Sequence, residues 1–410
     1  MKKFIVNPVK GFKDIYGKNS IIIEKIIAIA TEKVKKFGCI SLQTPIIERE
    51  ELFVKSLGNT TDIITKEIFR IVDDEKLILR PEQTSSVIRW AIKNRWDLTG
   101  QPRVYSYGPM FRHENPQKGR WRQFQQFNVE FINNKNPISN GEILLLTYEI
   151  MESIKKEFSL KTNFILKINT IGTFEDRQKY CQYLQDYIIG NNNFSSEAQT
   201  KAVNNPLRVL DSKNSSDIQQ LSSLKSIMEF INENSKNQWR QLLKLLETWN
   251  IPYQWDPYLV RGLDYYNDLV FEWIVDDNIT KSTVLAGGRY DGLAFYLTEK
   301  YHLPSVGFAL GIDRITDYIA DFVEINENII PLINIDASDD YVLIVAQYFR
   351  NKGEKIQILN YKKLQDNLKF IDNNNIYSKK VIIVGITEQN NNQYILKDLN
   401  QGQQWIKTME

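Results

Sequence analysis

The stretch from Phe111 to Glu130 constrains the fold of this chain more than any other segment. Successive side chains of a β-strand point to opposite faces, and the stretch predicts two strands joined by a charged loop. One face of the second strand is apolar and belongs to a core: Trp121, Phe127, Val129 and Phe131. The other face carries a cation, an aromatic ring, amides and a carboxylate: Arg122, Phe124, Gln126, Asn128 and Glu130.

Arg112 and Glu114 have the same parity on the first of these two strands. Burying such groups without partners is costly. A face that was simply exposed to solvent would have no reason to carry an aromatic ring among the polar groups. The surface suits a ligand that has a phosphate, a flat ring and an amino group.

The composition sets limits on the class of protein. A chain of 410 residues with 42% hydrophobic and 25% charged residues predicts an ordinary globular protein of two to three domains. The two cysteines, Cys39 and Cys181, exclude a disulfide framework and a Cys-rich zinc site. The two histidines, His113 and His302, exclude a His-Glu-x-x-His zinc helix, so we predict no metal site built by the protein.

We predict a cytoplasmic protein without a membrane segment. The first residues are positively charged, but their apolar run is too short for a signal peptide. No stretch approaches the length of a membrane span. The small number of cysteines fits a reducing compartment.

The order of strand-like and helical patterns predicts an α+β fold, an antiparallel sheet flanked by helices. Residues 1–168 are predicted to form the first part of this α+β domain, 169–250 a helical insertion with one helix over Asp217–Asn234, and 251–324 the second part. Residues 325–340 are predicted to be a linker, and 341–410 a small α/β domain whose first strand is Tyr341–Ala346. Its second strand follows so soon that a helical crossover does not fit, which predicts a shortened domain.

An amphipathic helix is predicted from Ser20 to Phe37. Its apolar stripe is equally compatible with packing on the sheet and with a subunit interface.

Four further stretches combine turn residues with charged or aromatic groups. Arg80–Thr84 brings Glu82 and Thr84 to a helix start, where a plain helix cap is the alternative. Leu259–Tyr266 surrounds a glycine with Arg261, Tyr265 and Tyr266. Ala286–Gly292 is a glycine-rich turn that a simple hairpin also explains, and Gly307–Arg314 joins a strand to a helix that carries an arginine.

With these motifs the sequence resembles the histidyl-tRNA synthetase family of the class II aminoacyl-tRNA synthetases. Ser20–Phe37 with Thr44-Pro45 resembles motif 1, Phe111–Glu130 motif 2, and Gly307–Arg314 motif 3. Leu259–Tyr266 and Ala286–Leu293 resemble the two histidine-specific signatures, and Asn205–Asp211 resembles part of the insertion domain. The resemblance covers nearly the whole chain. It implies a homodimer that activates L-histidine with ATP and transfers the histidyl group to the 3′ end of tRNA(His).

The resemblance also implies roles for individual residues. Arg112 would hold the ATP α-phosphate, Glu114 the adenine amino group and Phe124 the adenine ring, with Arg120 and Arg314 on the outer phosphates and Mg²⁺ accompanying the nucleotide. Arg261 would be a second catalytic cation beside Arg112, between the histidine carboxylate and the α-phosphate. The histidine site would comprise Glu82, Gln83, Thr84 and Gln126 near the ammonium group and Glu130, Tyr265, Tyr266 and Tyr290 near the imidazole.

Two positions depart from the family pattern. Gln83 stands where the family usually has glycine, next to the ammonium site. Asn115 stands where bacterial members usually have an arginine that contacts the acceptor end of tRNA. Gln117 and Arg122 remain available for that contact, so we expect altered reading of the acceptor end.

Two other functions are compatible with a synthetase-like sequence. A regulatory subunit would bind histidine without charging tRNA, but such paralogues usually lose the ATP-site arginines, which Arg112, Arg261 and Arg314 represent here. A sensor of uncharged tRNA would normally be part of a longer chain.

Overall fold

The computed structural model describes residues 6–58, 61, 63–72, 75–117, 119–212, 214–276, 281–325, 327–359, 363–374 and 376–409. These residues divide into two compact units. The larger contains residues up to 14 and residues 23–322, and the smaller contains residues 15–22 and 323–410.

A large sheet organises the first unit, in the order β1-β5-β6-β11-β10-β9-β7-β8. All pairs inside this sheet are antiparallel, and the parallel pairs β1–β5 and β7–β8 lie at its two edges. The strands are β1 Ile40–Ser41, β5 Arg103–Phe111, β6 Gln123–Phe131, β7 Phe164–Thr170, β8 Gln254–Trp255, β9 Asn267–Asp276, β10 Lys281–Arg289 and β11 Val306–Gly311. The predicted antiparallel α+β architecture is therefore confirmed.

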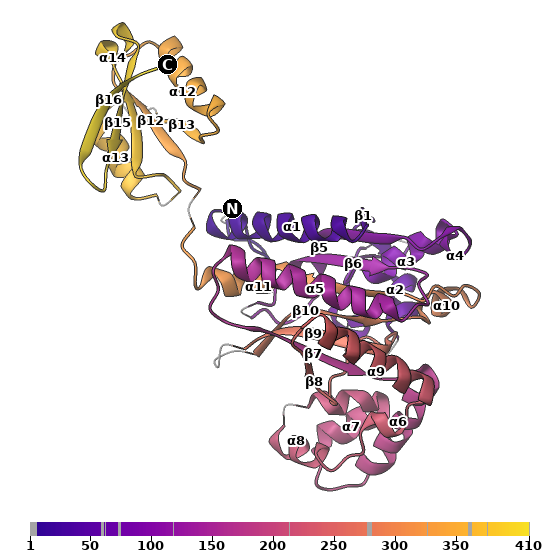
Figure 1. The fold of residues 1–410 in the computed structure, drawn as a ribbon. Helices are drawn as coiled ribbons and strands as arrows, with labels where there is room; N and C mark the ends of the chain where they lie inside the picture. Colours follow the sequence, from indigo (N-terminus) through magenta and orange to yellow (C-terminus); the bar gives the residue numbers. More distant parts are fainter. Residues whose placement is uncertain are drawn as a thin grey trace. The chain divides into compact units, whose positions relative to one another are not determined.

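Helices cover the large sheet (Figure 1). α5 Ile138–Glu157 and α11 Ile312–Ala320 pack against its central strands. α1 Lys18–Lys36 runs beside α5, to which it is joined by ion pairs of Lys25 with Glu157 and of Lys33 with Glu149. The helix predicted at Ser20–Phe37 is thus present and buries Ile26, Ala30 and Val34 completely.

A second, three-stranded sheet of order β2-β4-β3 belongs to the same unit. It comprises β2 Ile47–Arg49, β3 Phe69–Arg70 and β4 Leu77–Leu79. The helices around it are α2 Glu50–Leu57, the π-helix η1 Ile63–Glu67, α3 Thr84–Lys93, α4 Trp96–Thr99 and α10 Leu293–Thr298. α2, α3 and α10 pack on one another, so this layer supports the start of α3, where Glu82 and Thr84 lie.

Helices occupy the segment between β7 and β8, below the sheet in Figure 1. They are α6 Phe174–Ile188, α7 Ser196–Asn204, η2 Pro206–Asp211, α8 Ser215–Leu221, η3 Ile227–Glu229 and α9 Glu233–Thr248. The prediction of a single helix over Asp217–Asn234 is wrong. α8 ends at Leu221, and new starts are capped by Ser226 and by Asn232, whose side chain accepts a hydrogen bond from the backbone of Ser235.

The second unit has a sheet of order β13-β12-β14-β15-β16. Its strands are β12 Ile330–Asn334, β13 Ile356–Leu359, β14 Lys380–Val384, β15 Gln393–Asp398 and β16 Gln403–Thr408. Its helices are α12 Asp339–Asn351, α13 Leu364–Asp372 and α14 Ile386–Asn390. β12 pairs in parallel with both β13 and β14, and the last two strands are antiparallel.

Two predictions for this unit are wrong. The predicted linker 325–340 contains β12, and the predicted strand Tyr341–Ala346 is part of α12. The Ser338 side chain accepts a hydrogen bond from the backbone N–H of Tyr341, and two aspartates follow it in the first turn, so the helix start prevails over the β-branched residues. α12 is therefore the crossover from β12 to β13, and the short spacing that predicted a trimmed domain does not exist.

Candidate active site

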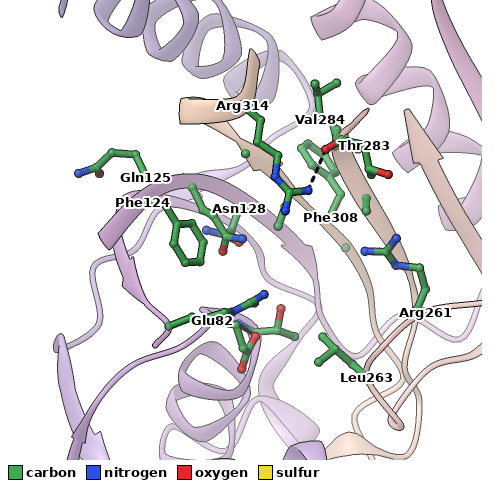
Figure 2. A pocket seen from close by; sticks show the side chains of 18 of the residues that line it. Glu82, Phe124, Gln125, Asn128, Arg261, Leu263, Thr283, Val284, Phe308 and Arg314 are labelled. Carbon is green, nitrogen blue, oxygen red and sulfur yellow. Dashed lines mark hydrogen bonds between the residues drawn. The ribbon is translucent and has the colours of Figure 1, made fainter. Parts of the chain in front are cut away.

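Residues from distant parts of the larger unit line one cavity over the central strands of the large sheet. Thirteen of the predicted site residues line it: Glu82, Thr84, Arg112, Glu114, Arg120, Phe124, Gln126, Glu130, Arg261, Tyr265, Tyr266, Tyr290 and Arg314. Figure 2 shows Glu82, Phe124, Arg261 and Arg314 pointing into this space from separate elements. The sequence-based interpretation requires such a common cleft.

The strand register leaves room for the polar face of β6. Gln126, Asn128 and Glu130 pair with Gly311, Ala309 and Gly307 on β11, so small residues face long ones. At Gly307 this is obligatory, because a Cβ atom built there would overlap the Glu130 carboxylate and the carbonyl oxygen of Val129. Gly307 of motif 3 thus makes room for a side chain of the neighbouring strand.

The deep end of the cavity is formed by Glu130 and three tyrosines. Glu130 is buried; the hydroxyl of Thr84 donates to its Oε1 at 2.7 Å, and the hydroxyl of Tyr290 donates to its Oε2. Burial raises the pKa of Glu130 to about 8, against the lowering effect of these two hydrogen bonds. Burial also raises the pKa of Tyr266 to about 12, so this phenol remains protonated and can donate.

Glu82 lies beside this polar cluster at the start of α3. Its two oxygens accept hydrogen bonds from the backbone N–H groups of Thr84 at 2.6 Å and of Ser85 at 2.9 Å. Burial raises the pKa of Glu82, while these hydrogen bonds and the charge of Arg112 lower it. One carboxylate thus satisfies backbone N–H groups at the start of α3 and also lines the cavity, while its contact with the histidine ammonium group stays a prediction.

Arginines dominate the other end of the cavity. The Nε atom of Arg112 donates to the carbonyl of Pro81 at 3.0 Å, and its guanidinium lies 5.3 Å from the centre of the Phe124 ring. Arg120 pairs with Glu114 at 3.4 Å. Arg314 donates to the carbonyl of Thr283 at 3.0 Å (Figure 2).

Arg314 is under electrostatic strain. Burial lowers the pKa of its guanidinium, and the charges of Arg120 and Arg112 lower it further. A cluster of mutually repelling, partly buried cations is stabilised when polyanions bind. This arrangement therefore favours a phosphate-rich ligand.

Arg261 is held between the two ends. Its Nη1 atom pairs with Glu272 Oε2 at 3.3 Å, and the hydroxyl of Thr283 donates to the same oxygen at 2.8 Å. The sequence analysis missed Glu272 and Thr283. The only available signal was their position on strands β9 and β10, and neither residue type in a strand predicts such a contact. The glycines predicted to form a turn, Gly287 and Gly288, lie in β10 itself.

Three predicted site residues do not line the cavity. Gln83 turns its side chain to Thr44, whose hydroxyl accepts from Nε2 at 2.8 Å. Arg122 donates to the carbonyl of Glu114 and packs on Gly11. The exposed Gln117, which was predicted to contact tRNA, lies outside the cavity in a bridge with Arg120.

The predicted alternation of side chains is wrong at Trp121. It was assigned to the core face, but it lines the cavity, and Lys13 lies 4.8 Å from its ring. The reason is that β6 begins at Gln123, so the alternation does not extend back to residues 121 and 122. Gln125 also contributes to the cavity wall although its side chain points away from the other labelled residues (Figure 2).

Comparison with known proteins assigns the family. The family model described as histidyl-tRNA synthetase matches residues 11–315, which include every element around the cavity. The chain belongs to the histidyl-tRNA synthetase family.

Relatives agree with this assignment over nearly the full length. The chain is 36% identical to the histidine–tRNA ligase of Orientia tsutsugamushi, over 96% of this chain and 94% of that protein. It is 34% identical to that of Rickettsia canadensis, over 99% and 98%. Among solved structures it is similar to the apo histidyl-tRNA synthetase of S. aureus, with a TM-score of 0.74 and 28% identity over 98% of this chain and 97% of that one.

A structure titled as an ATP phosphoribosyltransferase regulatory subunit/histidyl-tRNA synthetase from Bacillus halodurans is also similar, with a TM-score of 0.66 over 94% of this chain and 99% of that one. At 20% identity this likeness concerns the fold alone. In the described part of this chain, no helix is long and apolar enough to cross a membrane.

Proposed function

We propose that this chain joins L-histidine to ATP to form histidyl-adenylate and diphosphate, and then transfers the histidyl group to the 3′ end of tRNA(His). The observation that carries the proposal is the shared cavity. A buried carboxylate, three tyrosines and Glu82 line it together with four arginines, Arg112, Arg120, Arg261 and Arg314.

In the first step, a carboxylate oxygen of histidine attacks the α-phosphorus of ATP, and the bond from that phosphorus to the diphosphate breaks. Both reactants are anionic, so the principal barrier that the protein can lower is their repulsion. Arg112 and Arg261 would neutralise the carboxylate and the α-phosphate, while Arg120 and Arg314 would hold the leaving diphosphate. Positioning of this kind supplies effective molarities of about 10⁵–10⁸ M without a protein nucleophile.

In the second step, a hydroxyl of the terminal ribose of tRNA attacks the histidyl carbonyl carbon, and AMP leaves. Tyrosine and carboxylate groups would meanwhile retain the imidazole. Imidazole has one donor and one acceptor, which Glu130 and one of the phenols satisfy together. A site that binds its substrate by such hydrogen bonds rejects analogues lacking them by about 10⁴–10⁵-fold.

Mg²⁺ is expected to accompany ATP. The contacts of the carboxylates in the cavity indicate whether the protein could supply ligands for this ion. Among the residues that the structure describes, four carboxylates line the cavity: Glu82, Glu114, Glu130 and Asp313. Arg120 pairs with Glu114 and Lys13 with Asp313, while the other two accept hydrogen bonds from neighbouring backbone or hydroxyl groups. These residues do not offer a ligand set of their own, so the ion would be held chiefly by phosphate oxygens and water, as is usual for Mg²⁺.

We also propose that the enzyme is a homodimer. β1 is an edge strand of the large sheet, and apolar side chains on and after it are exposed: Ile40 is 56% exposed, Ile46 40% and Ile47 48%. Apolar groups gathered at a sheet edge mark an interaction site. Light scattering at micromolar concentration should give about twice the mass of the chain, 48.1 kDa, and a monomer would refute the proposal.

Histidine-dependent exchange of labelled diphosphate into ATP, followed by charging of tRNA(His), tests the main proposal. A ligase performs both reactions. A histidine-binding regulatory subunit performs neither, and this outcome would overturn the assignment. We further propose that the reaction takes place in the cytoplasm, and localisation of the tagged protein in cells tests this.

A further inference from the structure

The loop between β8 and β9 carries much of the active site but has no regular secondary structure of its own. Four of its side chains line the cavity: Arg261, Leu263, Tyr265 and Tyr266. A loop of this kind has many accessible conformations, and each one excluded costs entropy. Donors from elsewhere in the fold must therefore hold it if Arg261 is to be pre-positioned.

Arg177 on α6 provides such donors. Its Nη1 atom donates to the carbonyl oxygen of Asp264 at 2.8 Å and to that of Tyr266 at 2.6 Å. These two carbonyls flank Tyr265 in the chain. One guanidinium thus fixes the backbone on both sides of a tyrosine that lines the histidine end of the cavity.

The junction of α7 and η2 contacts the same loop. The Nη2 atom of Arg208 donates to the carbonyl oxygen of Gly262 at 3.1 Å, directly after Arg261. Asn205 donates to the side chain of Asp264 at 3.0 Å. All three donors come from the helical segment between β7 and β8, and none of them lines the cavity described above.

Arg177 is itself held in place. α6 begins with a capping box in which Thr173 and Asp176 bond each other's backbone N–H groups. The guanidinium of Arg177 lies 5.5 Å from the centre of the Phe174 ring. The chain just before α6 is bonded to the start of β9, because the backbone N–H of Ile171 donates to the carbonyl of Asp268 at 2.8 Å.

We propose that Arg177 is a positioning residue for histidine activation: it holds the 259–266 loop so that Arg261 and the tyrosines face the cavity. This inference rests on the proposed function for the role of Arg261. It makes the rate of adenylation depend on the helical segment, which does not contact the reacting atoms. A displacement of α6 would therefore change the rate of adenylation.

Kinetics of diphosphate exchange test the proposal with Arg177→Ala, Arg177→Lys and a matched control, Arg240→Ala. Arg240 is an exposed arginine on α9 of the same helical segment, and its side chain donates to Asn237, three residues earlier in the same helix. We expect Arg177→Ala to lower kcat by about 10- to 100-fold, the loss typical of a misplacement of about 1 Å at a reacting group. KM for histidine should rise, KM for ATP should change little, Arg177→Lys should recover part of the rate, and Arg240→Ala should match the wild type.

A double-mutant cycle distinguishes positioning from general damage. If Arg177 acts through Arg261, the loss of kcat caused by Arg177→Ala should largely disappear in an Arg261→Ala background. An equal loss in both backgrounds would overturn the proposal, as would unchanged kcat in Arg177→Ala.

Hydrogen exchange of the folded protein gives a readout that does not depend on activity. Amides of residues 259–266 should exchange faster in Arg177→Ala and Arg177→Lys than in Arg240→Ala, with exchange of β6 unchanged. Unchanged hydrogen exchange of residues 259–266 in Arg177→Ala would refute the proposed role of Arg177, even if the enzyme is active. Absence of histidine-dependent diphosphate exchange in the wild type would refute the proposed function instead. Hydrogen exchange of residues 259–266 would still decide whether Arg177 holds the loop.

Discussion

Replacing Gly307 by alanine should disable the histidine end of the site while leaving the ATP end intact. The new methyl group would occupy the space of the Glu130 carboxylate, which is held by Thr84 and Tyr290. Because β6 and β11 are paired at these two residues, neither strand can move away without breaking the sheet. The carboxylate is the more mobile of the two groups that the methyl group would overlap, so it moves and both of its hydrogen bonds are lost, while the overlap with the Val129 carbonyl oxygen adds backbone strain.

The expected cost follows from these two bonds. A buried hydrogen bond to a neutral or charged partner contributes about 1–3 kcal/mol, so losing both lowers the free energy of unfolding by about 2–6 kcal/mol. Loss of one further bond to the imidazole of the substrate lowers kcat/KM for histidine by about 10- to 100-fold. KM for ATP should stay within about twofold, because Phe124, Glu114 and Arg314 lie away from the overlap.

Diphosphate exchange at varied histidine and varied ATP measures both effects, and urea denaturation measures the stability. The variant Gly307→Ala combined with Glu130→Ala is the control, since removing the carboxylate relieves that overlap and leaves the one with the Val129 carbonyl oxygen. The stability cost of Gly307→Ala should be smaller in that background. Normal histidine kinetics in Gly307→Ala, or equal stability costs in both backgrounds, would show that the Glu130 carboxylate does not lie against residue 307.

Three further perturbations test other parts of the site. The pKa of Glu130 is raised in the folded protein to about 8, so its contribution to stability is complete at pH values below the unfolded pKa and is lost as pH rises towards 8. Glu130→Gln should therefore reduce the fall in unfolding free energy between pH 5 and pH 8.5 by up to about 4 kcal/mol, and an equal fall in both proteins, measured by urea denaturation, would contradict this. Arg261→Ala should slow diphosphate exchange by about 10²–10³-fold, as does removal of a transition-state donor, and near-normal exchange would exclude its catalytic role. Phe124→Ala should raise KM for ATP by about 10- to 100-fold through loss of stacking, with Phe124→Tyr close to the wild type, and an unchanged KM would place the adenine elsewhere.

The polar face of β6 was predictable because alternation along a strand is a local property. Phe124, Gln126 and Glu130 share the cavity wall as the pattern indicates. The same reasoning failed at Trp121 and Arg122, where the chain is not yet a strand. Alternation is valid only within an element, and the sequence does not mark the beginning of β6.

The small unit shows the corresponding difficulty for element type. Tyr341–Ala346 is rich in β-branched and aromatic residues and reads as a strand by side-chain preference alone. The cap at Ser338 starts a helix there, and its buried face consists of Tyr341, Val342, Val345 and Ala346. Two local signals conflict, and the packing of α12 against the sheet resolves the conflict.

The sequence by itself indicated most of the chemical groups that line the site and the family to which the chain belongs, because motifs are short-range patterns of residue types. Only the tertiary structure decided which groups meet: Gly307 against Glu130, Glu272 against Arg261, and Arg177 against the loop that carries Arg261. Each of these contacts joins residues on different elements. Their distances depend on strand register and on how helices pack, and neither is encoded in the periodicity of any single segment.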